Sequence, residues 1–278
     1  MADLLMILYV LAGIGIGFAA SLLGLGGGSL LVPMLTLVFG IPIHQAIGTS
    51  LFTIVFTSSS GSIEYVRKRI ADLKLGAMMI PFTIIGAVVG ANLSAQIPEN
   101  ILKAIFGVVL FIASIRMFLR KNRQRNSASK SLRLPNSKFL TFKRTFTDID
   151  DIEFEYTINI PLLALFGFCA GFLSGLLGIG GGIVQVPLLN IIFGVPIHVA
   201  IATSLFIIIF TSSFGTATHL ILGNVLITVG ILLVIGTIIG SQIGSRVAQK
   251  IERERLRRIF AIVLAFTGIR MAVSFLIV

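Results

Sequence analysis

Two glycine-rich runs are the part of this sequence best suited to chemistry. One extends from Gly24 to Gly28 and is interrupted only by Leu25, and the other extends from 178 to 182 and is interrupted only by Ile179. Glycine lets the backbone leave a helix with a positive φ angle. A helix that resumes beyond such a break presents unpaired N–H groups and the positive end of its dipole, which bind anions without a fixed charge. The two runs therefore predict a site for a small anion.

Hydroxyl side chains follow each glycine run and could donate hydrogen bonds to an anion. Thr49 and Ser50, with their counterparts at 203–204, are preferred because they lie near the start of the next helix. Helical spacing adds Thr57 to the same stripe. Alternatively, these hydroxyls bond to their own helix backbone, as is common in membrane helices. The predicted substrate-binding residues are Gly26, Gly27, Gly28, Ser29, Thr49, Ser50, Thr57, Gly180, Gly181, Gly182, Gln185, Thr203, Ser204 and Thr211.

Two histidines are candidates for gating or for proton-linked transport. His44 and His198 each follow an Ile-Pro-Ile turn or its Val-Pro-Ile counterpart, where they could instead cap or anchor a helix start. No Asp, Glu, Lys or Arg falls at the centre of a predicted span, which argues against a proton relay or a tight cation site. The sequence holds no metal-ligand cluster, nucleophile motif or nucleotide loop. We expect no metal, no cofactor, no nucleic-acid partner and no enzymatic activity.

The composition places these residues in a membrane. Hydrophobic residues make up 56% of the 278 residues and charged residues only 12%, and the mean hydropathy is +1.03. A soluble domain carries about 25% charged residues. Several apolar runs approach the roughly 20 residues that a membrane-spanning helix needs. They lack the short alternating pattern of barrel strands. The fold class predicted is an all-α polytopic membrane protein.

A membrane setting constrains how the glycine runs can be used. Contiguous glycines in lipid would leave backbone groups unsatisfied unless the break is buried in protein or lines a wet cavity. Close packing between helices through small residues is the alternative. Because both runs precede a short apolar segment, they favour a cavity.

The chain is an internal duplication. A shift of 154 positions (178 minus 24) places Gly24 on Gly178 and His44 on His198 without a gap, and more than half of the positions between 13 and 61 are identical to their partners. The domains predicted are a first membrane repeat at 1–119, a polar cytoplasmic linker at 120–157 and a second membrane repeat at 158–278.

Charge placement predicts that the two repeats have opposite orientations. The loop at 67–74 is basic, whereas its counterpart at 221–228 has no charged residue. The next loop reverses this pattern, because 246–258 is rich in arginine and its counterpart near Pro98 has only Glu99 and Lys103 nearby. Basic loops lie in the cytoplasm. The halves are therefore expected to be inverted-topology repeats, with the substrate near the middle of the membrane at their interface.

Each repeat is expected to contain five hydrophobic segments. The second segment, at 29–41 or 183–195, is too short to cross as a straight helix and is either broken or re-entrant. Five crossings per repeat, ten in all, with both termini outside, are favoured. Re-entrant segments would give eight crossings and cytoplasmic termini. The segments lie at 4–24, 29–41, 44–66, 75–95 and 100–119, then at 158–178, 183–195, 198–221, 225–246 and 256–277.

The linker is polar and first basic, then acidic. A solvated connection that rests near anionic lipid headgroups is favoured over a regulatory or partner-binding role. Phe139, Phe142 and Phe146 leave room for a short amphipathic surface helix.

Two motifs recur in both halves. They are Gly24-x-Gly26-Gly27-Gly28-x4-Pro33 and Gly40-x-Pro42-x-His44-x-Ala46-x-Gly48-Thr49-Ser50-Leu51. With them the sequence resembles the TauE/SafE family of sulfite and organosulfonate exporters over nearly everything outside the linker. The resemblance implies export of sulfite, sulfoacetate or a related sulfur-containing anion across the cytoplasmic (inner) membrane. Ala202 replaces Gly48, and Ile183 replaces Ser29, so the site is expected to be only pseudo-symmetric.

Other functions remain open at this stage. An anion channel could share the architecture, and a membrane scaffold or assembly factor would transport nothing. The absence of a charged residue at the centre of the predicted spans favours an anion whose export is driven by the membrane voltage. The partners expected are the small anionic substrate and the lipid bilayer, and a homodimer is considered.

Overall fold

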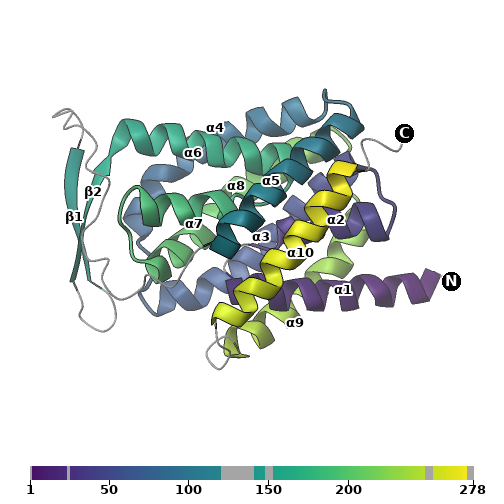
Figure 1. Cartoon of the computed structure of the whole chain (residues 1–278), viewed down its shortest axis with the longest axis horizontal. Coiled ribbons are helices and arrows are strands. Elements are labelled where there is room, and N and C mark those ends of the chain that lie inside the picture. Colours follow the sequence, from purple (N-terminus) through teal and green to yellow (C-terminus); the bar gives the residue numbers. More distant parts are fainter. Residues whose placement is uncertain (1, 24–25, 120–140, 148–152, 248–252, 274–278) are drawn as a thin grey trace.

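The protein is a bundle of helices with a two-stranded hairpin at one end (Figure 1). The structure is a computed structural model that describes residues 2–23, 26–119, 141–147, 153–247 and 253–273. The first half contains α1 (Ala2–Leu23), α2 (Gly28–Pro33), the π-helix η1 (Met34–Val38), α3 (Ile43–Arg67), α4 (Leu73–Ser94) and α5 (Glu99–Leu119). The second half contains α6 (Ile160–Leu177), α7 (Gly182–Ile191), α8 (Ile197–Ile221), α9 (Ile227–Val247) and α10 (Arg253–Val273).

The helices have the lengths and surfaces of membrane spans. In the described residues, α1, α3, α4, α6, α8 and α9 are long and apolar enough to cross a bilayer. Large apolar side chains are exposed along their outer faces, as at Ile85 and Val89 on α4 and Ile231 and Ile235 on α9. Lipid tails can cover such faces, whereas water would not. The chain is a multi-pass helical membrane protein, which confirms the predicted fold class.

Equivalent helices of the two halves make equivalent contacts across the boundary between the halves. The first helix of each half packs on the fourth helix of the other, so that α1 lies on α9 and α6 lies on α4, while α3 pairs with α8 and α5 with α10. Glycine makes these contacts close. A Cβ atom on Gly17 would lie 2.3 Å from the carbonyl oxygen of Thr237, and one on the equivalent Gly171 would lie 2.0 Å from that of Thr83. The halves are therefore locked together by matching backbone contacts.

Equivalent helices run in opposite directions along the long axis of the molecule. In Figure 1, α1 begins at the right, and α6 begins at the left beside the hairpin. The first helix starts, and the last helix ends, away from the hairpin. This arrangement agrees with the predicted inverted repeats, which stay a prediction. Their orientation in a membrane, and the choice between ten and eight crossings, stay predictions.

The second segment of each half is a short helix that follows the glycine run. The first of these, α2 with η1, spans 28–38, and α7 spans ten residues. At 1.5 Å per residue each is about 15 Å long, half of the roughly 30 Å hydrocarbon core. Pro33 ends α2, and Pro187 lies inside α7. The predicted shortness of these segments agrees with the structure.

The linker contains a β-hairpin. Strands β1 (Thr141–Thr147) and β2 (Glu153–Asn159) pair antiparallel, with Arg144 opposite Tyr156. The short amphipathic helix suggested around Phe142 and Phe146 is wrong, because both residues lie in β1. Alternating polar and apolar residues with several threonines favour a strand there. Phe139 lies outside the described residues.

Candidate functional site

In the described residues, each glycine run ends in a left-handed turn at the start of a short helix. Gly27 precedes α2 with a φ of 87°, and Gly181 precedes α7 with a φ of 83°. Side-chain-bearing residues rarely adopt such angles, which explains the glycines. The carbonyl oxygen of Gly181 accepts from the N–H groups of Val184 and Gln185 at 3.0 and 2.9 Å. The earlier N–H groups of α7 lack intrahelical partners, as at any helix start.

The two turns meet between the halves. A Cβ atom on Gly28 would lie 2.4 Å from the carbonyl oxygen of Gly178 and 2.8 Å from the carbonyl carbon of Ile179. The predicted glycine residues of both halves are therefore brought together, and a methyl group would disrupt the contact.

Two equivalent isoleucines fill the space beside the turns. Ile54 on α3 and Ile208 on α8 are both fully buried. The Cβ position of Gly26 lies 3.7 Å from the side chains of both, and that of Gly180 lies 3.1 Å from Ile54 and 3.5 Å from Ile208. Apolar side chains thus close the region between the two turns in this conformation.

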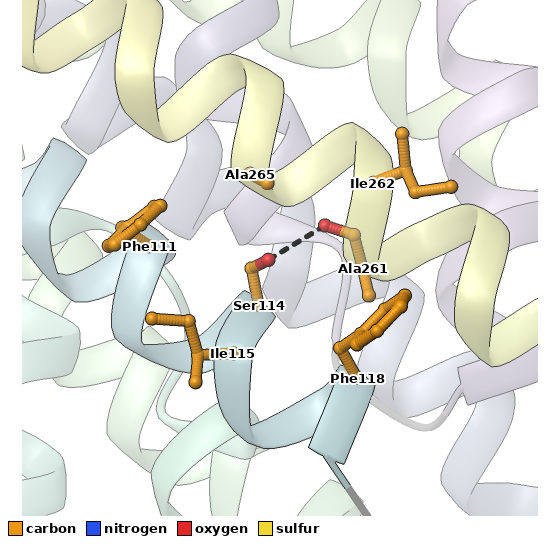
Figure 2. Close-up of a pocket in the computed structure, with 7 residues that line it drawn as sticks. All are labelled: Phe111, Ser114, Ile115, Phe118, Ala261, Ile262 and Ala265. Carbon is orange, nitrogen blue, oxygen red and sulfur yellow. Dashed lines mark hydrogen bonds between the residues drawn. The ribbon is translucent and has the colours of Figure 1, made fainter.

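The structure also has an open pocket elsewhere. It lies between α5 and α10, has a volume of about 410 Å³ and is almost entirely apolar (Figure 2). Its main polar group, Ser114, donates a hydrogen bond to the carbonyl oxygen of Ala261 at 2.9 Å. The residues that line it are Phe111, Ser114, Ile115, Phe118, Ala261, Ile262 and Ala265. None of the predicted site residues belongs to this pocket.

Two of the predicted hydroxyl ligands join the halves. Thr49 accepts a hydrogen bond from the backbone N–H of Leu226, and Thr203 accepts one from that of Asp72, both at 3.0 Å. The shift of 154 positions converts one pair into the other, since it relates Thr49 to Thr203 and Asp72 to Leu226. Each threonine therefore fixes the start of the fourth helix of the opposite half.

The other predicted hydroxyls are also engaged by protein. Ser50 donates to the carbonyl oxygen of Gly178 at 2.8 Å and so holds the second glycine turn. Ser204 and Thr57 donate to carbonyls of their own helices at 2.9 and 3.0 Å. Thr211 contacts the carbonyl oxygen of Ile207 and the hydroxyl of Thr83, each at 3.0 Å. These contacts are of the structural kind considered above as the alternative.

Other buried polar atoms near the turns have no hydrogen-bond partner in the described part of the protein. They belong to Ser29, Ser58, Ser174, Gln185 and Ser212. Each such group costs about 1–3 kcal/mol when it stays unsatisfied. The Cβ position of Gly26 lies 3.7 Å from the Oγ atom of Ser58. A polar ligand or water at the turns would satisfy these groups.

Sequence reasoning selected Ser29 and Gln185 from this group and missed the others. Thr57 and Thr211 were chosen in place of their neighbours Ser58 and Ser212. Helical spacing could have identified Ser58, because it follows Ile54 by four residues and so lies on the same face of the helix.

The predicted histidines lie at helix starts. His44 and His198 occupy the first turns of α3 and α8 and are half-buried, and the Nδ1 atom of His44 lacks a partner in the described residues. Sequence reasoning gave no role to His219. It is fully buried, and its Nε2 atom lies 3.2 Å from the carbonyl oxygen of Gly175. Since a carbonyl only accepts, Nε2 carries the proton.

A buried carboxylate holds the linker hairpin. Asp72 caps α4 by accepting from the N–H groups of Lys74 and Leu75, each at 3.1 Å. The guanidinium of Arg144 donates to both carboxylate oxygens at 2.5 and 2.6 Å, and the Tyr156 hydroxyl donates to one of them. Burial acts to raise the pKa of Asp72, but the hydrogen bonds from Arg144 and Tyr156 hold it below its usual value.

The hairpin also packs on α7. Tyr156 and Ile158 are buried in one apolar cluster with Leu75 of α4 and with Val186 and Leu189 of α7. Burial, together with the hydrogen bond to Asp72, raises the pKa of Tyr156. The hairpin therefore joins the start of α4 to the helix that carries Gln185.

Comparison with known proteins gives a consistent set of relatives. The model of the family described as Sulfite exporter TauE/SafE matches residues 9–271. Probable membrane transporter protein YunE of Bacillus subtilis is 32% identical over 273 residues, which cover 95% of this chain and 96% of that protein. A probable membrane transporter protein of Methanocaldococcus jannaschii is 30% identical over 286 residues, covering 96% of each.

A plant protein is more distant. Sulfite exporter TauE/SafE family protein 6 of Arabidopsis thaliana is 24% identical over 291 residues, which cover 77% of this chain and 68% of that protein. No solved structure matches the chain.

Proposed function

Because the chain belongs to the TauE/SafE family of membrane transporters, we propose that it exports a small sulfur-containing anion, such as sulfite, sulfoacetate or a related organosulfonate. Sulfite export is part of the name of the family and of its Arabidopsis relative. For this chain, sulfite export is part of the proposal. The direction proposed is outward across the cytoplasmic membrane.

The observation that carries the proposal is the group of buried, unpartnered polar atoms beside the glycine turns. It consists of hydroxyl groups on α2, α3, α6 and α8 and of the Gln185 carboxamide on α7, and so comes from both halves. The buried charged side chain among the described residues is Asp72, which is already paired with Arg144. Hydroxyls, amides and a helix start without a fixed cation suit a small anion that must be released again.

The isoleucines beside the turns close the proposed site in this conformation, as expected for one state of a carrier. Ile54 and Ile208 pack against both turns and are fully buried, so the region between the turns is closed in this conformation. A carrier would open this region to one side at a time. With a negative cell interior, each exported negative charge gains about 2.3 kcal/mol per 100 mV, which can drive export without another energy source.

Counterflow in proteoliposomes tests the proposal. Vesicles that contain the purified protein are loaded with unlabelled sulfite and diluted into labelled sulfite, methanesulfonate or sulfate at a set membrane potential. We expect saturable, voltage-sensitive flux of sulfite or the sulfonate, absent from protein-free vesicles. A failure to move any anion would contradict the proposal. Flux that rises linearly to high concentration would instead identify a channel.

A further inference from the structure

The two glycine turns have different surroundings. At the first turn, a Cβ atom on Gly27 would lie 3.2 Å from the Cβ atom of Ala20 and 3.4 Å from the side chain of Ile16. At the second turn, a Cβ atom on Gly181 would lie 3.1 Å from the Nε2 atom of Gln185 and 3.4 Å from the carbonyl oxygen of Ala170. Gly27 of the first turn therefore faces apolar side chains, whereas Gly181 of the second turn faces polar atoms.

The duplication identifies the substitutions behind this difference. Three positions around the second turn hold residues that are smaller or more polar than their first-turn partners. The shift of 154 positions pairs Ile16 with Ala170, Ala20 with Ser174, and Leu31 with Gln185. These three substitutions add a hydroxyl and a carboxamide at the second turn, whereas one substitution goes the other way, because Ile183 replaces Ser29.

The added groups are fully buried and lack partners. Ser174 and Gln185 have no exposed surface, and the Oγ atom of Ser174 and both polar atoms of the Gln185 side chain have no hydrogen-bond partner in the described residues. The Nε2 atom of Gln185 points at the turn, as its 3.1 Å distance from the Gly181 Cβ position shows. The first turn has the unpartnered hydroxyls of Ser29 and Ser58 but no carboxamide. A buried carboxamide with neither end satisfied favours a polar partner at the turn, which an anion would supply.

We propose that the transported anion is held at the second glycine turn, by the Gln185 carboxamide, the Ser174 hydroxyl and the first N–H groups of α7. The first turn serves mainly as packing against Ile16 and Ala20. This inference rests on the proposed function, because it assigns the binding contacts of the same anion. It makes Gln185 the residue that determines specificity.

The same geometry selects the charge of the substrate. The second turn offers neutral donors and the partial positive charge of one helix start, and the described atoms nearest to Gly181 belong to Gln185 and Ala170. Such a site compensates one negative charge far better than two, because desolvation becomes steeply more costly for a dianion. Hydrogensulfite and methanesulfonate are therefore expected to bind more tightly than sulfate, and among the substrates proposed above sulfoacetate, which carries two negative charges, is expected to bind less tightly than they do.

The test exchanges residues between the two turns. Gln185→Leu and Ser174→Ala give the second turn the residues of the first, and Ala20→Ser adds a hydroxyl at the matching position of the first turn as the control. The half-saturating concentration for methanesulfonate counterflow and the thermal stabilisation by methanesulfonate and hydrogensulfite are measured in purified protein. We expect Gln185→Leu to raise the half-saturating concentration about tenfold or more, and Ser174→Ala to raise it about three- to tenfold. Ala20→Ser should match the wild type.

The outcomes separate this inference from the proposed function. Wild-type affinity in Gln185→Leu, or an equal loss in Ala20→Ser and Ser174→Ala, would overturn the asymmetric site while transport by the wild type stands. A wild-type protein that moves no anion would instead remove the proposed function. If Gln185→Leu does not fold, Gln185→Met keeps the length of the side chain without its polar atoms, and monodisperse protein with unchanged affinity would again overturn the inference. Binding of sulfate as tightly as methanesulfonate would contradict the charge selection.

Discussion

The hydroxyl oxygen of Thr203 lies 3.0 Å from the backbone nitrogen of Asp72, across the boundary between the two halves of the chain. The carboxylate of the same Asp72 binds Arg144 of the linker hairpin. One residue thus ties together the start of α4, the helix α8 and the hairpin. The equivalent contact between Thr49 and Leu226 is not linked to a further segment in this way, because Leu226 replaces the aspartate and has no carboxylate.

Loss of either threonine hydroxyl should weaken the contact between the halves. Thr203→Val or Thr49→Val leaves a backbone N–H group without its acceptor, so we expect destabilisation of about 1–3 kcal/mol. Thermal unfolding in detergent measures the effect. Thr53→Val is the matched control, because Thr53 donates only to a carbonyl of its own helix and its counterpart is Ile207. Equal stabilities of all three variants would contradict the structural role.

Removal of the buried carboxylate should detach the hairpin. Asp72→Asn leaves the partly buried Arg144 without a counter-charge, and we expect a loss of about 2–3 kcal/mol, below the usual range for a fully buried pair. Protease cleavage in the hairpin should accelerate. Glu64→Gln serves as the control, since its ion pair with Lys68 is largely exposed and should contribute little. A hairpin as protease-resistant as in the wild type would argue against the docking role of Asp72.

Acid should destabilise the wild type through the same residue. The pKa of Asp72 is lower in the folded protein than the ordinary value of 3.8. The resulting stability is present above pH 3.8 and is lost as the pH falls through the folded pKa. The unfolding temperature measured across this acidic range should fall for the wild type and change less for Asp72→Asn. Parallel curves for the two proteins would exclude this contribution.

A methyl group at the second glycine turn should abolish transport. Gly181 and Gly194 both have a positive φ angle, 83° and 71°, so alanine at either position carries similar backbone strain. A Cβ atom at Gly181 meets Gln185 at 3.1 Å, whereas one at Gly194 has nothing within 4 Å. We therefore expect similar stabilities but loss of counterflow only in Gly181→Ala. Normal flux in that variant would remove the turn from the binding site.

Truncation of the two central isoleucines should make the protein leaky. Ile54→Ala combined with Ile208→Ala removes the side chains that fill the space beside the glycine turns, and we expect anion flux that no longer saturates. Efflux from vesicles under voltage measures this change. Ile85→Ala on the exposed face of α4 is the control and should leave flux unchanged. Saturable flux in the double variant would mean that the barrier lies elsewhere.

The helices, the duplication and the meeting of the glycine turns could be predicted because each depends on patterns that repeat along the sequence. Hydrophobic runs and the shift of 154 positions indicate which segments are equivalent. The opposite directions of α1 and α6 in Figure 1 agree with the inversion that charge placement predicts. The motifs also indicate the family, which the comparisons confirm.

The roles of single polar residues could not be predicted in the same way. Thr203 and Asp72 are 131 positions apart, and nothing in the sequence pairs a threonine oxygen with that N–H group. Asp72 was interpreted only as part of a charged loop, because its partners Arg144 and Tyr156 belong to a hairpin that was not predicted. The choice of Thr57 over Ser58 failed to identify an unpartnered hydroxyl, since adjacent residues on a helix face different neighbours.

The close backbone contacts between the halves have a mechanical consequence. Since Gly17 and Gly171 leave no room for even a methyl group, α1 can hardly slide on α9, or α6 on α4. Each of these pairs should move as a single rigid body that contains one helix from each half. Any rocking that exposes the turns alternately is then expected between these two rigid bodies. The parts that move would therefore each combine helices of both repeats, and neither repeat would move as a unit.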